Sequence, residues 1–186
     1  MTPREVEEYR ALRATIRERG TARIWLLFAS FVAWAASTIA TTALAASPLA
    51  TLLPLLVLAV GFEAIVNLHT GVERIGRYLQ VFFEGEHEPP PGGPDSIRNT
   101  AGWEQAAMAY GRTYPGGSDP LSAAQFVLAT ILNVLPMLLA DPVPVEVMVI
   151  GALHILFVVR VLVARHHAGR QCAIDLERFQ RIKQDT

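Results

Sequence analysis

The stretch that decides the fold is Pro48–Leu68, with the sequence PLATLLPLLVLAVGFEAIVNL. Its only formally charged residue is Glu63. A helix rises about 1.5 Å per residue, so this stretch matches a bilayer core about 30 Å thick. We therefore predict that it crosses a membrane as a helix.

Three further apolar stretches of similar length accompany it, at 24–46, 121–140 and 143–164. The first and second stretches are separated by very few residues, and so are the third and fourth. Such short connectors favour helices that turn straight back into the bilayer. The sequence therefore predicts an all-α polytopic membrane protein with four transmembrane helices in two hairpins.

Residue pairs that suit the start of a helix precede most of the predicted helices. A side-chain oxygen followed by proline is typical of an N-cap and a first turn. Thr2-Pro3-Arg4-Glu5 adds the reciprocal pattern of a capping box. The remaining pairs are Ser47-Pro48, Asp119-Pro120 and Asp141-Pro142.

The sixteen basic residues predict the orientation. They lie before residue 24, between 69 and 120, or from 160 onward, and the connectors 45–47 and 140–142 contain none. Cytoplasmic segments of membrane proteins are enriched in Lys and Arg. We therefore expect the chain in a cell membrane, as a multi-pass protein with both termini in the cytoplasm.

The chain accordingly divides into alternating cytoplasmic and membrane segments. Gly20 and Thr21 are predicted to end an N-terminal helix and to begin the first span. The five segments are a cytoplasmic amphipathic helix at 1–23, a transmembrane hairpin at 24–68, a cytoplasmic connector at 69–120, a second hairpin at 121–164 and a cytoplasmic C-terminal helix at 165–186, which extends the fourth span.

The connector has its own predicted structure. A helix runs to about Glu84, and it either continues the second span or starts anew after His69-Thr70-Gly71. Prolines and glycines then predict a loop at 85–94, followed by a short helix at 96–110 and a turn at 114–117. Most of the charged residues therefore lie outside the predicted spans.

Composition excludes several classes of protein. A hydrophobic content of 52% exceeds the usual value for soluble domains, and a net charge of −1 argues against a nucleic-acid binder. The single cysteine, Cys172, forms no intrachain disulfide and is predicted to be an inert thiol. No P-loop, GxSxG, HExxH or CxxC motif occurs, so no enzyme is predicted.

The preference for Arg over Lys suggests a GC-rich bacterial genome, and hence a location in the bacterial inner membrane.

Glu63 and Arg160 are charged residues inside predicted spans, and such residues are costly in a bilayer. Both lie a few residues from the predicted cytoplasmic end of their span, so they could form an ion pair. Alternatively, Arg160 extends to the headgroups while Glu63 is protonated or bonded to a hydroxyl. In a functional role, Glu63 would bind a proton or a cation.

Asn133 and His154 form a second predicted polar layer. Both lie near the middle of their spans and could meet inside the second hairpin. A hydrogen bond that joins two spans is the structural interpretation. Lining a path for ions, together with Glu63 and Arg160, is the functional interpretation.

Small residues recur every four positions in the first span. Their spacing lets helix backbones approach closely, so they predict a packing face within the protomer or between protomers. The residues of this stripe are Ala29, Ala33, Ser37 and Thr41.

A metal or haem site at the cytoplasmic rim has weaker support. His69 and Glu73 are four residues apart, and His166 and His167 could approach from the last span. Metal sites need three or four convergent ligands, which only folding could bring together. No cofactor is therefore predicted, and the four residues stay as weak candidates.

Three functions follow from these observations. The first is a small integral membrane protein that acts through helix–helix assembly in the lipid bilayer, as a homo-oligomer or an accessory subunit of a membrane complex. The second is an oligomeric ion channel or small transporter that uses Glu63, Asn133, His154 and Arg160. The third is a haem- or metal-binding membrane subunit. No nucleic-acid partner is expected.

Overall fold

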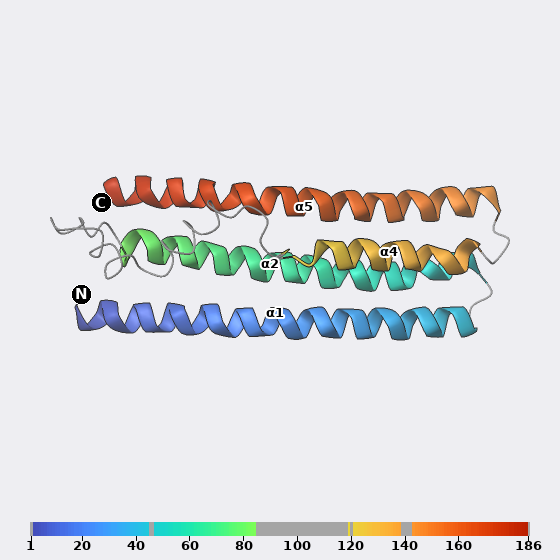
Figure 1. Ribbon diagram of the computed structural model, residues 1–186, viewed down its shortest axis with the longest axis horizontal. Helices are drawn as coiled ribbons and strands as arrows, with labels where there is room; N and C mark the ends of the chain where they lie inside the picture. The colour runs from blue at the N-terminus through green and yellow to red at the C-terminus, as the bar shows by residue number, and fades with distance from the viewer. Residues whose placement is uncertain (1, 45–46, 85–118, 120, 139–142, 186) are drawn as a thin grey trace, which may run out of the picture. The chain divides into compact units, whose positions relative to one another are not determined.

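The computed structural model describes residues 2–44, 47–84, 119, 121–138 and 143–185, and all regular structure in these ranges is helical (Figure 1). The all-α prediction is therefore confirmed for the described residues. The elements are α1 (Pro3–Leu44), the short 3₁₀ helix η1 (Pro48–Thr51), α2 (Leu52–Phe82), α4 (Ala123–Leu138) and α5 (Pro144–Gln184).

Three stretches of helix are long and apolar enough to span a membrane. They are Pro3–Leu44, Pro48–Phe82 and Pro144–Ala168. The predicted third span corresponds to α4, which is apolar but has only 16 described residues. Among the described residues, the candidates for membrane spans are therefore three long helices, with α4 as a shorter apolar helix.

The predicted helix end at Gly20 is wrong, because α1 runs without a break from Pro3 to Leu44. One glycine in a helix costs only about 1 kcal/mol relative to alanine, and the backbone hydrogen bonds on both sides remain available. Likewise, α2 continues through Thr70 and Gly71. The predicted extension of the last span is confirmed, because α5 reaches Gln184.

Hydrogen bonds identify the helix starts. The capping box is present, because Thr2 N donates to Glu5 Oε2 at 2.6 Å and Glu5 N donates to Thr2 Oγ1 at 3.3 Å. Ser47 caps η1 rather than an α-helix, with Leu49 N donating to its hydroxyl at 3.3 Å. The Asp119 carboxylate accepts from the backbone of residues 121 and 124 at 3.3 and 3.1 Å, ahead of α4.

Several predicted features lie outside the described residues. These are the loop at 85–94, the helix at 96–110, the turn at 114–117, Pro120 and the Asp141-Pro142 cap.

The chain divides into two compact units. Unit 1 comprises 1–19, 70–118 and 169–186, and unit 2 comprises 20–69 and 119–168. Helices α1, α2 and α5 contribute residues to both units. The segment boundaries predicted at 23, 68, 120 and 164 stay a prediction.

Four phenylalanines, one each from α1, α2, α4 and α5, form the centre of unit 2. Phe126 of α4 lies with its ring centroid 5.1 Å from both Phe31 of α1 and Phe62 of α2. Phe157 of α5 lies 6.0 Å from Phe62 and 6.5 Å from Phe126. Tilted and edge-on aromatic pairs of this kind each contribute about 0.5–1.5 kcal/mol beyond their buried area. These rings thus join α1, α2, α4 and α5.

Charged side chains hold the described part of unit 1 together. Arg13 Nη2 donates to Glu84 Oε1 at 2.6 Å, and Lys183 Nζ donates to the Val81 carbonyl at 2.9 Å. Asp175 is buried and accepts from Gln171 at 3.0 Å. Aromatic rings pack beside these contacts, namely those of Tyr9, Tyr78, Phe82, Phe83 and Phe179.

Candidate functional site

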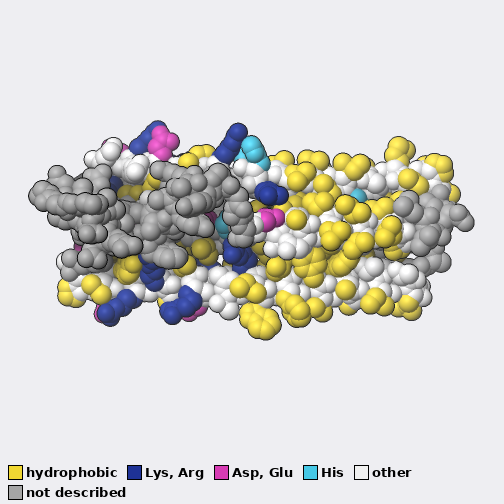
Figure 2. Space-filling model, in the orientation of Figure 1, with side chains coloured by type: hydrophobic (Ala, Val, Ile, Leu, Met, Phe, Trp, Pro, Cys, Tyr) yellow, Lys and Arg dark blue, Asp and Glu magenta, His cyan; other side chains and the backbone are white. Residues whose placement is uncertain are grey.

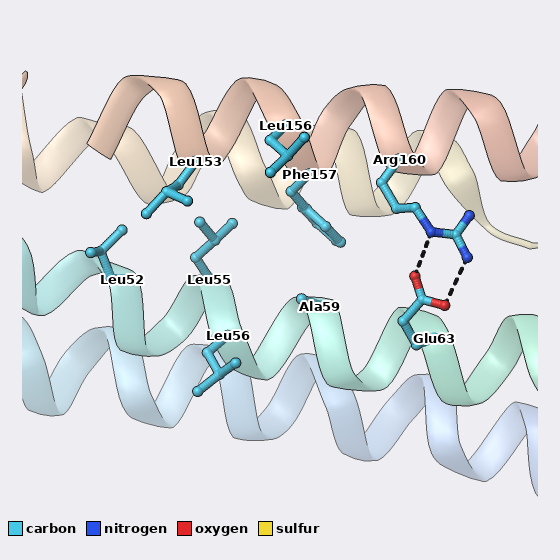
Figure 3. A pocket seen from close by; sticks show the side chains of 9 residues that line it. All are labelled: Leu52, Leu55, Leu56, Ala59, Glu63, Leu153, Leu156, Phe157 and Arg160. Atoms are coloured by element: carbon cyan, nitrogen blue, oxygen red, sulfur yellow. Dashed lines mark hydrogen bonds and ion pairs between the residues drawn. The ribbon is translucent and has the colours of Figure 1, made fainter. Parts of the chain in front are cut away.

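The charged pair of unit 2 is formed by Glu63 on α2 and Arg160 on α5. Arg160 Nη2 donates to Glu63 Oε2 at 2.8 Å, and Arg160 Nε lies 2.8 Å from Glu63 Oε1 in the same ion pair (Figure 3). This two-pronged geometry adds both strength and directional specificity to the attraction between an arginine and a carboxylate. The structure therefore brings together Glu63 and Arg160, the two charged residues within the predicted second and fourth spans.

This pair lies on the exposed side of unit 2. The side chains of Glu63 and Arg160 are 44% and 43% exposed. Ionisable residues within membrane spans normally face the bundle interior or a water-filled cavity. A guanidinium has five N–H donors, so two bonds to Glu63 leave three further N–H groups on Arg160 for another acceptor.

An apolar groove between α2 and α5 leads away from the pair. It has a volume of about 480 Å³ and ends at Glu63 and Arg160 (Figure 3). Apart from this pair, its lining is entirely apolar. The lining residues are Leu52, Leu55, Leu56, Ala59, Leu153, Leu156 and Phe157. The groove and its charged end form the surface that we call the α2/α5 face.

Asn133 and His154 form a separate polar cluster that is buried in unit 2. Asn133 Nδ2 lies 3.0 Å from His154 Nε2 and donates to the Thr51 carbonyl at 2.9 Å. The indole of Trp34 donates to Asn133 Oδ1 at 3.4 Å. His154 Nδ1 lies 2.8 Å from the carbonyl of Ile150. The two side chains thus connect α4 and α5 with α1 and η1.

The hydrogen-bond directions in this cluster follow from its two carbonyl groups. A carbonyl only accepts, so His154 Nδ1 carries the proton and His154 Nε2 accepts from Asn133. Every nitrogen and oxygen atom of the Asn133 and His154 side chains then has a partner among the described residues. The cluster is suited to joining helices and presents no unused polar atom to a ligand.

The small-residue stripe of α1 is divided between a groove and hydrogen bonds within its own helix. Ala29 and Ala33 are exposed and line a second groove, of about 420 Å³, between α1 and α2. Ser37 and Thr41 hydroxyls donate to carbonyls of their own helix at 2.9 Å. A packing face between protomers stays a prediction for this stripe.

A close approach of α1 and α2 at Gly61 was not among the predictions from the sequence. A Cβ atom added to Gly61 would lie 2.6 Å from Ser30 Cβ, so only glycine fits there. Ser30 follows Ala29 directly and is buried. The single glycine of the apolar stretch 48–68 was the available signal.

The four weak metal-ligand candidates do not converge on one point: His69 and Glu73 bond to arginines, and His166 and His167 are exposed. Arg23 Nη1 donates to His69 Nδ1 at 3.1 Å, and Glu73 accepts from Arg77 at 3.3 Å. His166 and His167 are exposed. Among the described residues, no group of three or more His, Cys, Asp or Glu side chains could hold a metal ion. This arrangement gives no support to a haem or metal site.

Cys172 belongs to unit 1 and is not a nucleophile. Its Sγ donates to Glu73 Oε2 at 2.8 Å. Burial, reinforced by the neighbouring Glu73 carboxylate, raises the pKa of the thiol from 9.0 to about 12. Reactivity requires the thiolate, so this thiol is inert at neutral pH.

Comparisons with known protein families, curated proteins and solved structures find no match to the chain.

Proposed function

We propose that this chain is a small integral membrane protein that works by helix–helix assembly, with further copies of itself or with a subunit of a membrane complex. The α2/α5 face carries this proposal. A formally charged ion pair is exposed there at the end of an exposed apolar groove. Charges that face lipid are costly, so a protein surface that covers the pair would be favoured.

The apolar surface of unit 2 supports a location in the bilayer. Hydrophobic side chains cover the visible side of α4 almost continuously (Figure 2). The large exposed side chains of α4 are Leu128, Ile131, Leu132 and Leu135. A surface of this extent is typical of contact with lipid or with another protein.

In the proposed topology, α4 serves as the third of four spans. Its 16 described residues correspond to about 24 Å of helix. The apolar sequence continues on both sides, from 121 to 140. Two hairpins with both termini in the cytoplasm, in a bacterial inner membrane, agree with the distribution of arginine.

The channel or transporter alternative has less support. Its path would need Asn133 and His154 to offer polar atoms to an ion, but these atoms already bond one another and Thr51, Trp34 and Ile150. Of the four proposed path residues, only Glu63 and Arg160 have polar atoms that an ion could reach, and they lie on an exposed side of the bundle.

The oligomeric state tests the proposal. The full chain is purified in mild detergent, transferred to lipid nanodiscs and weighed by native mass spectrometry. We expect one defined stoichiometry above one, or a co-purified protein in fixed ratio. A monomer with no bound protein, in several lipids and at high concentration, would contradict the proposal.

A further inference from the structure

We infer that the α2/α5 face binds a second copy of this chain, and that Arg160 of each copy donates to Glu63 of the other copy. This inference rests on the proposed function and deepens it, because it names the partner, the surface and the symmetry. It follows from three observations, which concern helix direction, charge and groove shape.

Residue numbers increase in the same direction along α2 and α5, and Glu63 and Arg160 lie at one level (Figure 3). Consider a two-fold axis that runs parallel to these helices through the groove. It places α2 of one copy opposite α5 of the second copy, with both copies in the same orientation in the membrane. Such an interface uses the same surface twice, as most homodimers do.

The charges are self-complementary under this rotation. The rotation keeps the level of each residue, so Arg160 of the second copy comes opposite Glu63. Each Arg160 has three N–H groups that Glu63 of its own copy does not use, and each carboxylate can accept more than two bonds. Two exposed ion pairs thereby become one neutral cluster of four charges, shielded from lipid. A flat apolar partner would leave these hydrogen-bonding groups unused.

The groove has the same symmetry. Leu56 precedes Glu63 by seven residues, and Leu153 precedes Arg160 by seven residues. Both leucines line the groove, and they are 58% and 40% exposed. The rotation brings Leu56 opposite Leu153 of the second copy, so leucines from each copy can enter the other copy's groove of about 480 Å³. Charge and shape therefore select the same occupant.

Charge complementation tests the cross-paired contact. Glu63→Arg places two cations at this level of one copy, and Arg160→Glu places two anions there. Two copies of the same variant should repel each other. A mixture of the two variants should associate, because the cations of one variant then face the anions of the other. We therefore co-express copies with two different affinity tags and measure the fraction of one tag that is captured with the other.

We expect capture to fall at least about tenfold for each single variant with itself, and to return towards the wild-type level for the mixture. The exchanged variant Glu63→Arg/Arg160→Glu should associate with itself. Leu128→Arg, at an exposed position of α4, serves as the control for adding charge elsewhere. Undiminished capture for both single variants, or no recovery in the mixture, would overturn the inference.

Cysteine cross-linking gives a second test that leaves the ion pair intact. In a Cys172→Ser background, copies with Leu56→Cys are mixed with differently tagged copies with Leu153→Cys and are oxidised in membranes. We expect disulfide cross-links between the Leu56→Cys and Leu153→Cys copies. We expect none between copies that carry Leu128→Cys instead and are oxidised in the same way. Cross-links only at Leu128, in a protein that remains oligomeric, would refute this face but keep the proposed assembly.

The remaining outcomes also separate the two proposals. A stable monomer without cross-links would refute both of them. A monomer that retains a lipid in one-to-one ratio would show that lipid, rather than a second copy, fills the groove.

Discussion

Units 1 and 2 share three helices but are held together by different interactions. In unit 2, four phenylalanines and a closed polar cluster join the helices, and Glu63–Arg160 is the exposed ion pair between α2 and α5. In unit 1, charged contacts between the helices recur along the described residues. Examples are Arg13–Glu84 at 2.6 Å and Arg74–Asp175 at 3.7 Å.

This difference in interactions is the one expected if lipid surrounds unit 2 and water surrounds unit 1. Lipid is as apolar as leucine, so helices in a bilayer gain little from burying leucine and depend on close packing and hydrogen bonds. In water, charged side chains stay solvated on their outer sides and can pair across helices at little cost. The contact of Ser30 with Gly61 and the bonds of Asn133 are interactions of the first kind. We therefore expect the two units to respond differently to the same perturbations.

The largest expected effect concerns the thiol in unit 1. Because the pKa of Cys172 is raised from 9.0 to about 12, its thiolate population at pH 8 is lower than in the unfolded chain. Alkylation should be slower in the folded protein by about 100- to 1000-fold, since each pKa unit is a factor of ten. Rates measured by mass spectrometry, with iodoacetamide, check this expectation.

A matched control moves the thiol by one residue, in Cys172→Ser/Ala173→Cys, because Ala173 is exposed. Equal rates for the two positions would contradict the expectation.

The raised pKa of Cys172 also gives the stability of the protein a pH dependence. The unfolded chain loses the thiol proton at lower pH than the folded chain. The stability contributed by the protonated thiol is therefore present below about pH 9 and is lost as the pH rises towards 12.

The second effect concerns close packing in unit 2. Gly61→Val should destabilise the protein by about 2–3 kcal/mol, because the added side chain meets Ser30. Gly151→Val is the matched control, since no atom lies within 4 Å of a Cβ placed there. Thermal unfolding in detergent should show a lower midpoint for Gly61→Val than for Gly151→Val. Equal midpoints would mean that α1 and α2 do not depend on this approach.

The smallest effect compares the units directly. Raising the salt concentration from about 0.05 to about 0.5 M shortens the Debye length and weakens ion pairs that water reaches, such as Arg74–Asp175, in which the Arg74 side chain is 57% exposed. Hydrogen exchange in unit 1 should become faster by about two- to fivefold, as expected for losses of up to about 1 kcal/mol. Exchange in α4 should stay unchanged. A similar acceleration in both units would remove the proposed difference in solvent.

Part of the candidate site could be predicted from the sequence. Glu63 and Arg160 stand out as charged residues in apolar stretches, and counting residues at 1.5 Å each places them at similar depth. The same count placed Asn133 near His154. The exposure of the Glu63–Arg160 pair could not be predicted, because it depends on how α2 and α5 are rotated about their axes.

By itself, the sequence determined the helical class, the apolar stretches and the unusual residues within them. These properties are local, since hydropathy and helix length follow from a few consecutive turns. Only the tertiary structure decided that α1 continues through Gly20, that Ser30 contacts Gly61, and that Glu63 faces outward with Arg160. A helix that is apolar on all sides carries no periodic signal to mark its inner face. Packing against neighbouring helices must therefore choose that face.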